Sequence, residues 1–79
     1  MDKLLVDVSL GKNLRYLRKS KGLSQSALVS QMQIIGSNIP CTTYNKIEQG
    51  TRNLYVSDLI RLKRIYSVSF DDFFKNIEI

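Results

Sequence analysis

The chain has 79 residues with a formal net charge of +5, and 43% of them are hydrophobic, which is ordinary for one small soluble globular domain. Because it has no histidine and one cysteine, it cannot form a Ser-His or Cys-His nucleophile pair or a typical zinc site. We therefore predict a protein that is not an enzyme and has no metal or cofactor. No apolar run approaches the roughly 20 residues that cross a bilayer, so we expect no membrane partner, and the lone cysteine favours the cytoplasm.

The first eight residues precede any helical pattern, and we expect an N-terminal extension at 1–8. Its apolar residues fit a strand, a dimer contact or a loose arm equally well: Leu4, Leu5, Val6 and Val8.

The first helix is predicted over 10–21, with Ser9 as its N-cap, Gly22 as its stop and an apolar stripe of Leu10, Leu14 and Leu17. The second helix is predicted over 24–35, with Ser24 as its N-cap and a stripe of Leu28, Met32 and Ile35.

A third helix is predicted over residues 40–50, because proline suits a first helical turn and glycine suits a helix end. Its apolar face consists of Tyr44 and Ile47, with Cys41 as a further candidate. Its other face carries short polar groups and one cation but no acid: Thr42, Asn45, Lys46 and Gln49. Such a face can read the edges of DNA bases. It can equally be an ordinary solvated surface.

The remaining pattern predicts two more helices. A fourth helix begins after Ser57 as its N-cap and runs to about Tyr66, with Leu59, Leu62, Ile65 and Tyr66 directed inward. A fifth is opened by Ser69 and covers about 70–76, with Phe70, Phe73 and Phe74 closing the core. Five short helices make an all-α domain at residues 9–76, followed by a short C-terminal tail at 77–79.

Charge is unevenly distributed along the chain. Residues 9–64 contain ten Lys and Arg against two acids, whereas both ends are net acidic. A basic middle favours a polyanionic partner such as nucleic acid. The alternative is a basic surface that serves only solubility.

Four fragments, in this order, resemble the phage-repressor-like, Cro-type helix-turn-helix family, also called the xenobiotic-response-element type. They are Leu-Gly-Lys-Asn-Leu-Arg-Tyr-Leu-Arg at 10–18, Gly-Leu-Ser-Gln at 22–25, Tyr-Asn-Lys-Ile-Glu-Gln-Gly at 44–50 and Val-Ser-Phe-Asp-Asp-Phe-Phe at 68–74. The resemblance implies a compact five-helix, lambda-repressor-like domain whose second and third helices form the helix-turn-helix. It implies a transcriptional regulator that binds double-stranded DNA sequence-specifically, as a homodimer on a two-fold operator.

Site residues are carried over by matching position. The resemblance implies base-facing residues at Cys41, Thr42, Asn45 and Lys46. It implies a phosphate and base-edge anchor at Gln25 and backbone contacts at Thr43 and Arg52, with Asn13 as a further candidate. Because Asn suits adenine and Lys suits guanine, Asn45 and Lys46 are expected to read those bases. The plainer interpretations are a first-turn residue for Gln25, a solvated lysine for Lys46 and a helix-start hydrogen-bonding group for Thr43.

Arg18 and Glu48 match a pair that ties the first helix to the third in this family, so we expect a structural ion pair.

The turn departs from the family pattern. Seven residues separate Met32 from Pro40, about five more than in the compact turn, so either the second helix is extended or the turn is a loop. Pro40 also stands where the family has a Ser or Thr cap, so the start of the third helix can shift by one residue. Cys41 is either a thiol activated by the helix N-terminus or a small apolar residue near a thymine methyl group or the core edge.

Two further functions remain open. A protein-interaction module of the same fold, antitoxin-like or an accessory subunit, would bind a protein partner through its apolar ends at 4–8 and 70–79. A regulator that lacks a sensing domain is the other possibility, because only five residues follow Phe74 and no effector domain is expected.

Overall fold

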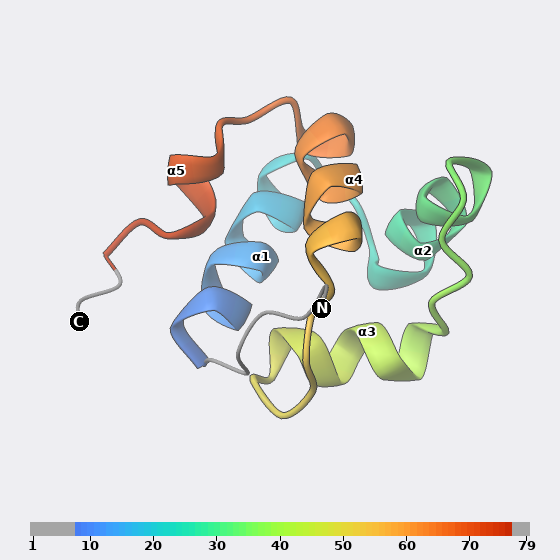
Figure 1. Cartoon of the computed structure of the whole chain (residues 1–79), viewed down its shortest axis with the longest axis horizontal. Helices are drawn as coiled ribbons and strands as arrows, with labels where there is room; N and C mark the ends of the chain where they lie inside the picture. Colours follow the sequence, from blue (N-terminus) through green and yellow to red (C-terminus); the bar gives the residue numbers. More distant parts are fainter. Residues whose placement is uncertain (1–7, 77–79) are drawn as a thin grey trace.

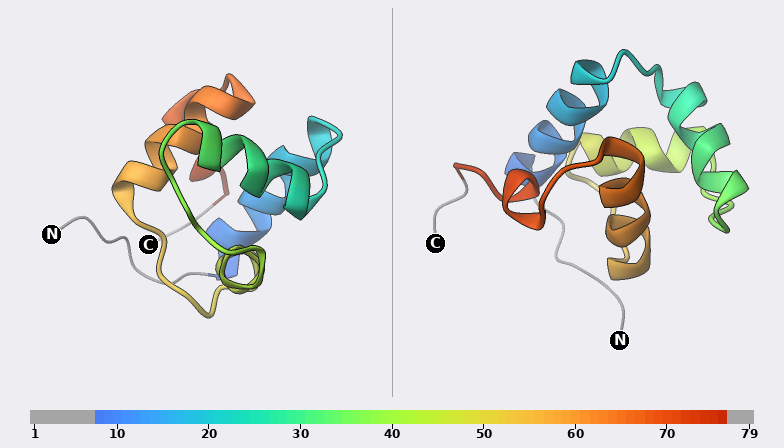
Figure 2. Two further views of the ribbon diagram at one scale, coloured as in Figure 1. Left: turned by 90° about the vertical axis from the view of Figure 1, so that its right-hand side faces the viewer. Right: turned by 90° about the horizontal axis from the view of Figure 1, so that it is seen from above.

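The computed structural model describes residues 8–76, which form five helices (Figure 1). In chain order they are α1 (Val8–Ser20), α2 (Gln25–Ile34), α3 (Cys41–Glu48), α4 (Val56–Tyr66) and α5 (Phe70–Phe73). α1 packs on α3 and α5, and α2 packs on α3 and α4. Figure 2 shows that α3 lies at one edge of the bundle, below the other helices as Figure 1 is drawn. The predicted all-α, five-helix architecture is confirmed. Of the predicted extension at 1–8 and tail at 77–79, only Val8 lies within the described residues.

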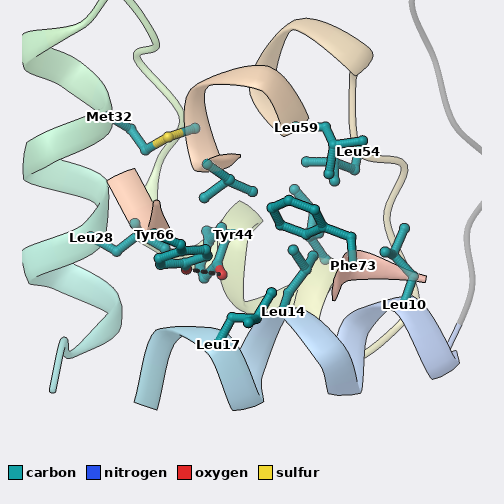
Figure 3. Packing of buried hydrophobic residues seen from close by; sticks show 12 residues of the cluster. Leu10, Leu14, Leu17, Leu28, Met32, Tyr44, Leu54, Leu59, Tyr66 and Phe73 are labelled. Carbon is teal, nitrogen blue, oxygen red and sulfur yellow. Dashed lines mark hydrogen bonds between the residues drawn. The ribbon is translucent and has the colours of Figure 1, made fainter. Parts of the chain in front are cut away.

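The core contains at least one residue from each helix, and its central members are drawn in Figure 3. Its buried hydrophobic residues are Leu10, Leu14, Leu17, Leu28, Met32, Tyr44, Ile47, Leu54, Leu59, Leu62, Tyr66 and Phe73. Nearly all of them were expected from apolar residues recurring every three or four positions. The hydroxyl oxygens of Tyr44 and Tyr66 lie 3.4 Å apart inside this core, so two polar groups that are costly to bury meet each other.

Three residues predicted to point inward do not. Ile35 is 37% exposed because α2 ends at Ile34 and the chain turns away there. Phe70 and Phe74 are 43% and 42% exposed, because α5 has a single turn and only Phe73 reaches the core. The ring of Phe70 instead lies 5.2 Å from the Nζ of Lys63, within the range of a cation–π contact.

Helix ends were predicted less accurately than helix faces. α1 begins at Val8, so Ser9 lies inside its first turn and is not the N-cap. α4 likewise begins at Val56 after Tyr55, so Ser57 is not its cap. Ser24 does cap α2, because its Oγ accepts a hydrogen bond from the backbone N–H of Ala27 at 3.0 Å. Ser69 opens α5 in a capping box with Asp72.

The start of α1 crosses the end of α3 at very short range. A Cβ atom at Gly11 would overlap the backbone carbonyl of Glu48, and one at Gly50 would lie 2.7 Å from the Cα of Val8. Only glycine allows the two backbones to approach this closely at these positions. Val8, the first residue of α1, thus lies against Gly50, just beyond the end of α3.

The α2–α3 connection combines the two alternatives left open by the sequence. α2 continues two residues beyond Met32 to Ile34, and a six-residue connection then covers 35–40. The helix ends in a Schellman motif, with the N–H of Ser37 bonded to the carbonyl of Met32 at 2.9 Å and Gly36 at a φ of +104°. Pro40, which opens the predicted helix and stands at the family's cap position, is the N-cap of α3, with a φ of −68° and a ψ of 149°, so the helix itself begins at Cys41.

Candidate nucleic-acid interface

α3 presents one side to the core and the other to solvent. Its buried side consists of Tyr44, Ile47 and Glu48. Successive residues turn by about 100° around a helix axis. The residues opposite the core are therefore Thr42, Lys46 and Gln49, and all three are exposed. Gln49 belongs to the polar face predicted from the sequence, but it is absent from the residues that the family resemblance implied. The helical periodicity that placed Thr42 and Lys46 on this face also indicated Gln49.

Two polar hollows flank this face. The α1 hollow, about 360 Å³ in volume, lies between α1 and α3 and includes the cations Lys12 and Arg15 beside Asn45. The loop hollow, about 630 Å³, lies beside the segment that follows α3 and includes Thr43, the cation Arg52 and the acid Asp58, which is paired with Arg61. Thr43 and Asn45 are two residues apart, so they point about 160° apart around the axis. The outward face of α3 therefore lies between Lys12 and Arg15 on one side and Arg52 on the other.

Arg18 and Glu48 form the predicted ion pair between α1 and α3. Arg18 Nε donates to Glu48 Oε2 at 2.7 Å, Arg18 Nη2 donates to Glu48 Oε1 at 3.1 Å, and both side chains are buried. Arg18 Nη1 also donates to the carbonyl of Leu23 at 2.7 Å, which ties the α1–α2 turn to the pair. Burial alone would raise the pKa of Glu48, but hydrogen bonds from Arg18, Tyr44 and Gln25 hold it below its usual value. The only acid on α3 is thus neutralised inside the protein and does not repel phosphate.

Gln25 is the first residue of α2 and joins the two helices of the motif. Its Nε2 donates to Asn45 Oδ1 at 3.0 Å and to Glu48 Oε1 at 3.2 Å. Both hydrogens of the amide are therefore used within the protein, and the side-chain oxygen is the atom left for other partners. An anion needs a donor, so a phosphate contact at this position falls to the backbone N–H groups that begin α2.

The other predicted site residues lie at the start of α3 and after its end. Cys41 is exposed and does not belong to the apolar core, which leaves the thymine-methyl and reactive-thiol interpretations. Arg52 is exposed on the segment after α3. Asn13, a further candidate for a DNA contact, donates from its Nδ2 to the carbonyls of Phe73 at 2.8 Å and Lys75 at 2.9 Å, so both hydrogens of its amide are used within the protein. Asn13 therefore anchors the segment around the end of α5 to α1.

Within residues 8–76, no group of three or more Cys, Asp or Glu side chains is placed to hold a metal ion. None of the helices in that range has the length and apolar character to span a membrane.

No family model and no curated protein matches the chain. Solved structures similar to it include two restriction-modification controller proteins. The restriction-modification controller protein C.AhdI from Aeromonas hydrophila shares 27% identity with a TM-score of 0.72, and the match covers 85% of this chain and 94% of that one. A point mutant of the restriction-modification controller protein C.Esp1396I shares 25% identity with a TM-score of 0.69, covering 95% and 87% respectively. The helix order, the placement of α2 and α3 and these two likenesses show that the chain has the all-α, lambda-repressor-like fold in which α2 and α3 form a helix-turn-helix, and that it is similar to helix-turn-helix controller proteins.

Proposed function

We propose that the protein is a non-enzymatic transcriptional regulator that binds double-stranded DNA and reads it with α3 in the major groove. One observation carries the proposal: the exposed face of α3 is polar, contains no acid and lies between cations on both sides. A reading helix needs neutral donors and acceptors for base edges, and its flanks need positive charge for the two phosphate backbones. The likeness to two controller proteins supports a regulatory role.

The proposed contacts divide by chemistry. Bases are read by residues on the outward face of α3, at its edge and in its first turn, namely Cys41, Thr42, Asn45, Lys46 and Gln49. Phosphates on one side of the groove are held by Lys12, Arg15 and the start of α2 at Gln25. Phosphates on the other side are held by Thr43 and Arg52. The eight residues of α3 span about 12 Å, which suits one half-site, so two copies on a two-fold operator are expected.

Selection from a pool of random duplexes tests this proposal. We expect enrichment of a palindrome whose half-sites are centred about 34 Å apart or a multiple of that distance, with affinity that falls steeply as salt is raised. Arg64→Ala is the matched control for the flanking cations, because Arg64 is exposed in the last turn of α4, at the end far from α3 (Figure 1). Loss of binding in this control equal to the loss in Arg52→Ala would contradict the assigned face.

A protein-interaction module is the second candidate function. It is favoured by Ile34, which is 83% exposed at the end of α2, and by Phe70 and Phe74, which are both more than two-fifths exposed. Indifference to every duplex, together with a stable complex with a second protein that Ile34→Ser abolishes, would establish this function in place of DNA reading.

A further inference from the structure

A continuous series of hydrogen bonds runs from the interior of the protein to the reading face of α3. Arg18 donates two hydrogen bonds to the carboxylate of Glu48. Glu48 Oε1 also accepts a hydrogen bond from Gln25 Nε2, and the same nitrogen donates to Asn45 Oδ1. Four side chains from three helices are thereby connected, and the last of them lies in the α1 hollow beside the outward face.

The orientation of each amide in this series follows from the charge at its start. A carboxylate has acceptors only, so Gln25 can face Glu48 only with its NH₂ group. That NH₂ group also meets Asn45, and a donor can be met only by an acceptor, so Asn45 directs its oxygen toward Gln25. The NH₂ group of Asn45 is then the part of the side chain free to meet an outside partner. Reversing either amide would place two donors or two acceptors against each other.

We propose that Arg18, Glu48 and Gln25 make Asn45 a hydrogen-bond donor toward DNA, so that it selects a base with two acceptors at its major-groove edge, guanine, over adenine. The proposal rests on the function proposed above. Guanine presents N7 and O6 as acceptors, whereas adenine presents one acceptor, N7, and one donor, the N6 amino group. An unconstrained asparagine pairs with adenine because it offers both an oxygen and an NH₂ group. Asn45 has its oxygen turned toward Gln25, so the expectation that it reads adenine is replaced.

Gln25 is in this view a positioning residue, and Asn45 is the residue that contacts the base. The series also explains why Gln25 and Glu48 contact each other at the edge of a basic face. A solvated acid there would weaken DNA binding, whereas an acid neutralised by Arg18 fixes the polarity of its neighbours without exposing its charge.

The test begins with selection of duplexes by the wild-type protein and by Asn45→Ala. The position at which Asn45→Ala loses its base preference is the position that Asn45 reads. We expect the wild type to prefer guanine over adenine there by about 10-fold. Replacing that guanine with 7-deazaguanine should lower the affinity by a similar factor. Adenine at that position, or no position that responds to Asn45→Ala, would overturn the proposal. A wild type that enriches no duplex at all would instead contradict the proposed function.

Gln25→Met then tests the positioning role, because methionine has similar length but no amide. We expect the guanine-to-adenine preference at the Asn45 position to fall toward 1, while preferences at other positions stay unchanged. Gln33→Met, at an exposed position near the far end of α2, is the matched control and should leave all preferences unchanged. Equal weakening on every sequence in Gln25→Met would show a purely structural role and overturn the proposal. The 7-deazaguanine measurement uses the wild-type protein and therefore stands even if Gln25→Met fails to fold.

Discussion

Arg61 on α4 donates a hydrogen bond from its Nε to the backbone carbonyl of Ile35, 3.2 Å away at the end of α2. The guanidinium is held in place by Asp58, whose Oδ1 lies 3.0 Å from Arg61 Nη1. The long α2–α3 connection begins at this carbonyl, and α3 has no side-chain cap of its own because its N-cap is Pro40. Arg61 therefore ties the start of this connection to α4.

Arg61→Ala should weaken binding to the selected operator without changing its salt dependence. The substitution removes a charge-assisted hydrogen bond at a half-exposed position, so the free energy of unfolding should fall by about 1 kcal/mol. The apparent affinity should fall because α3 is less well positioned. Urea unfolding measures the first effect, and fluorescence anisotropy at several salt concentrations measures the second. A shallower salt slope would mean that Arg61 contacts phosphate directly.

Removing only one partner of the ion pair between Arg18 and Glu48 should lower the free energy of unfolding strongly. Arg18→Met leaves a buried carboxylate without its cation, and such losses typically cost about 3–5 kcal/mol of the free energy of unfolding. Adding Glu48→Leu should recover part of that loss, because no unpaired charge then remains. Urea unfolding of the two variants measures the difference. A cost below about 1 kcal/mol for Arg18→Met would place the pair among ordinary surface salt bridges.

Acid should destabilise the protein through Glu48. The pKa of Glu48 is lowered in the folded state, so below its ordinary value of 4.5 the unfolded state binds the proton more readily. The stabilisation is present above that value and is lost as pH falls through the lowered folded-state pKa. Urea midpoints should decline over this range in the wild type and decline less in Glu48→Gln. Identical pH profiles for the two proteins would show that other carboxylates control acid unfolding.

Lys12 and Arg15 should act on DNA affinity through phosphates alone. Each neutralised phosphate contributes about 0.9 to the slope of log affinity against log salt, so the double Ala variant should have a slope smaller by about 1.8. The selected base sequence should stay the same, because phosphate contacts carry no sequence information. Arg64→Ala should retain the wild-type slope. A changed sequence preference in the double variant would contradict this assignment.

The sequence predicted the parts of the fold that depend on repeated local patterns. Leu14, Met32 and Tyr44 were placed in the core because burial of one helix face requires apolar residues every three or four positions. Ser24 was placed as a cap because its side chain acts within its own turn. Phe70 and Phe74 were misplaced because the length of α5, and hence the number of inward positions, is not fixed by spacing.

The candidate site was predictable as a polar helix face but not as a hydrogen-bond network. The resemblance implied the pairing of Arg18 with Glu48, and helical periodicity gave the polar side of α3. The contacts of Gln25 with Asn45 join residues twenty positions apart and depend on how α2 crosses α3, which residue patterns do not specify. The role of Arg61 was missed for a similar reason: its partner is a backbone carbonyl, and a carbonyl has no sequence signature.

Lys46 is expected to determine one base of the half-site, because it is exposed at the centre of the outward face of α3. Its ammonium can donate to guanine N7 and O6, and loss of such a contact costs about 1–3 kcal/mol at that base pair. Lys46→Ala should therefore bind the operator and its variants at that single position with nearly equal affinity, while discrimination at the Asn45 position persists. Anisotropy titrations on duplexes that differ at one base pair measure this. A uniform loss on all duplexes, together with a smaller salt slope, would make Lys46 a phosphate contact.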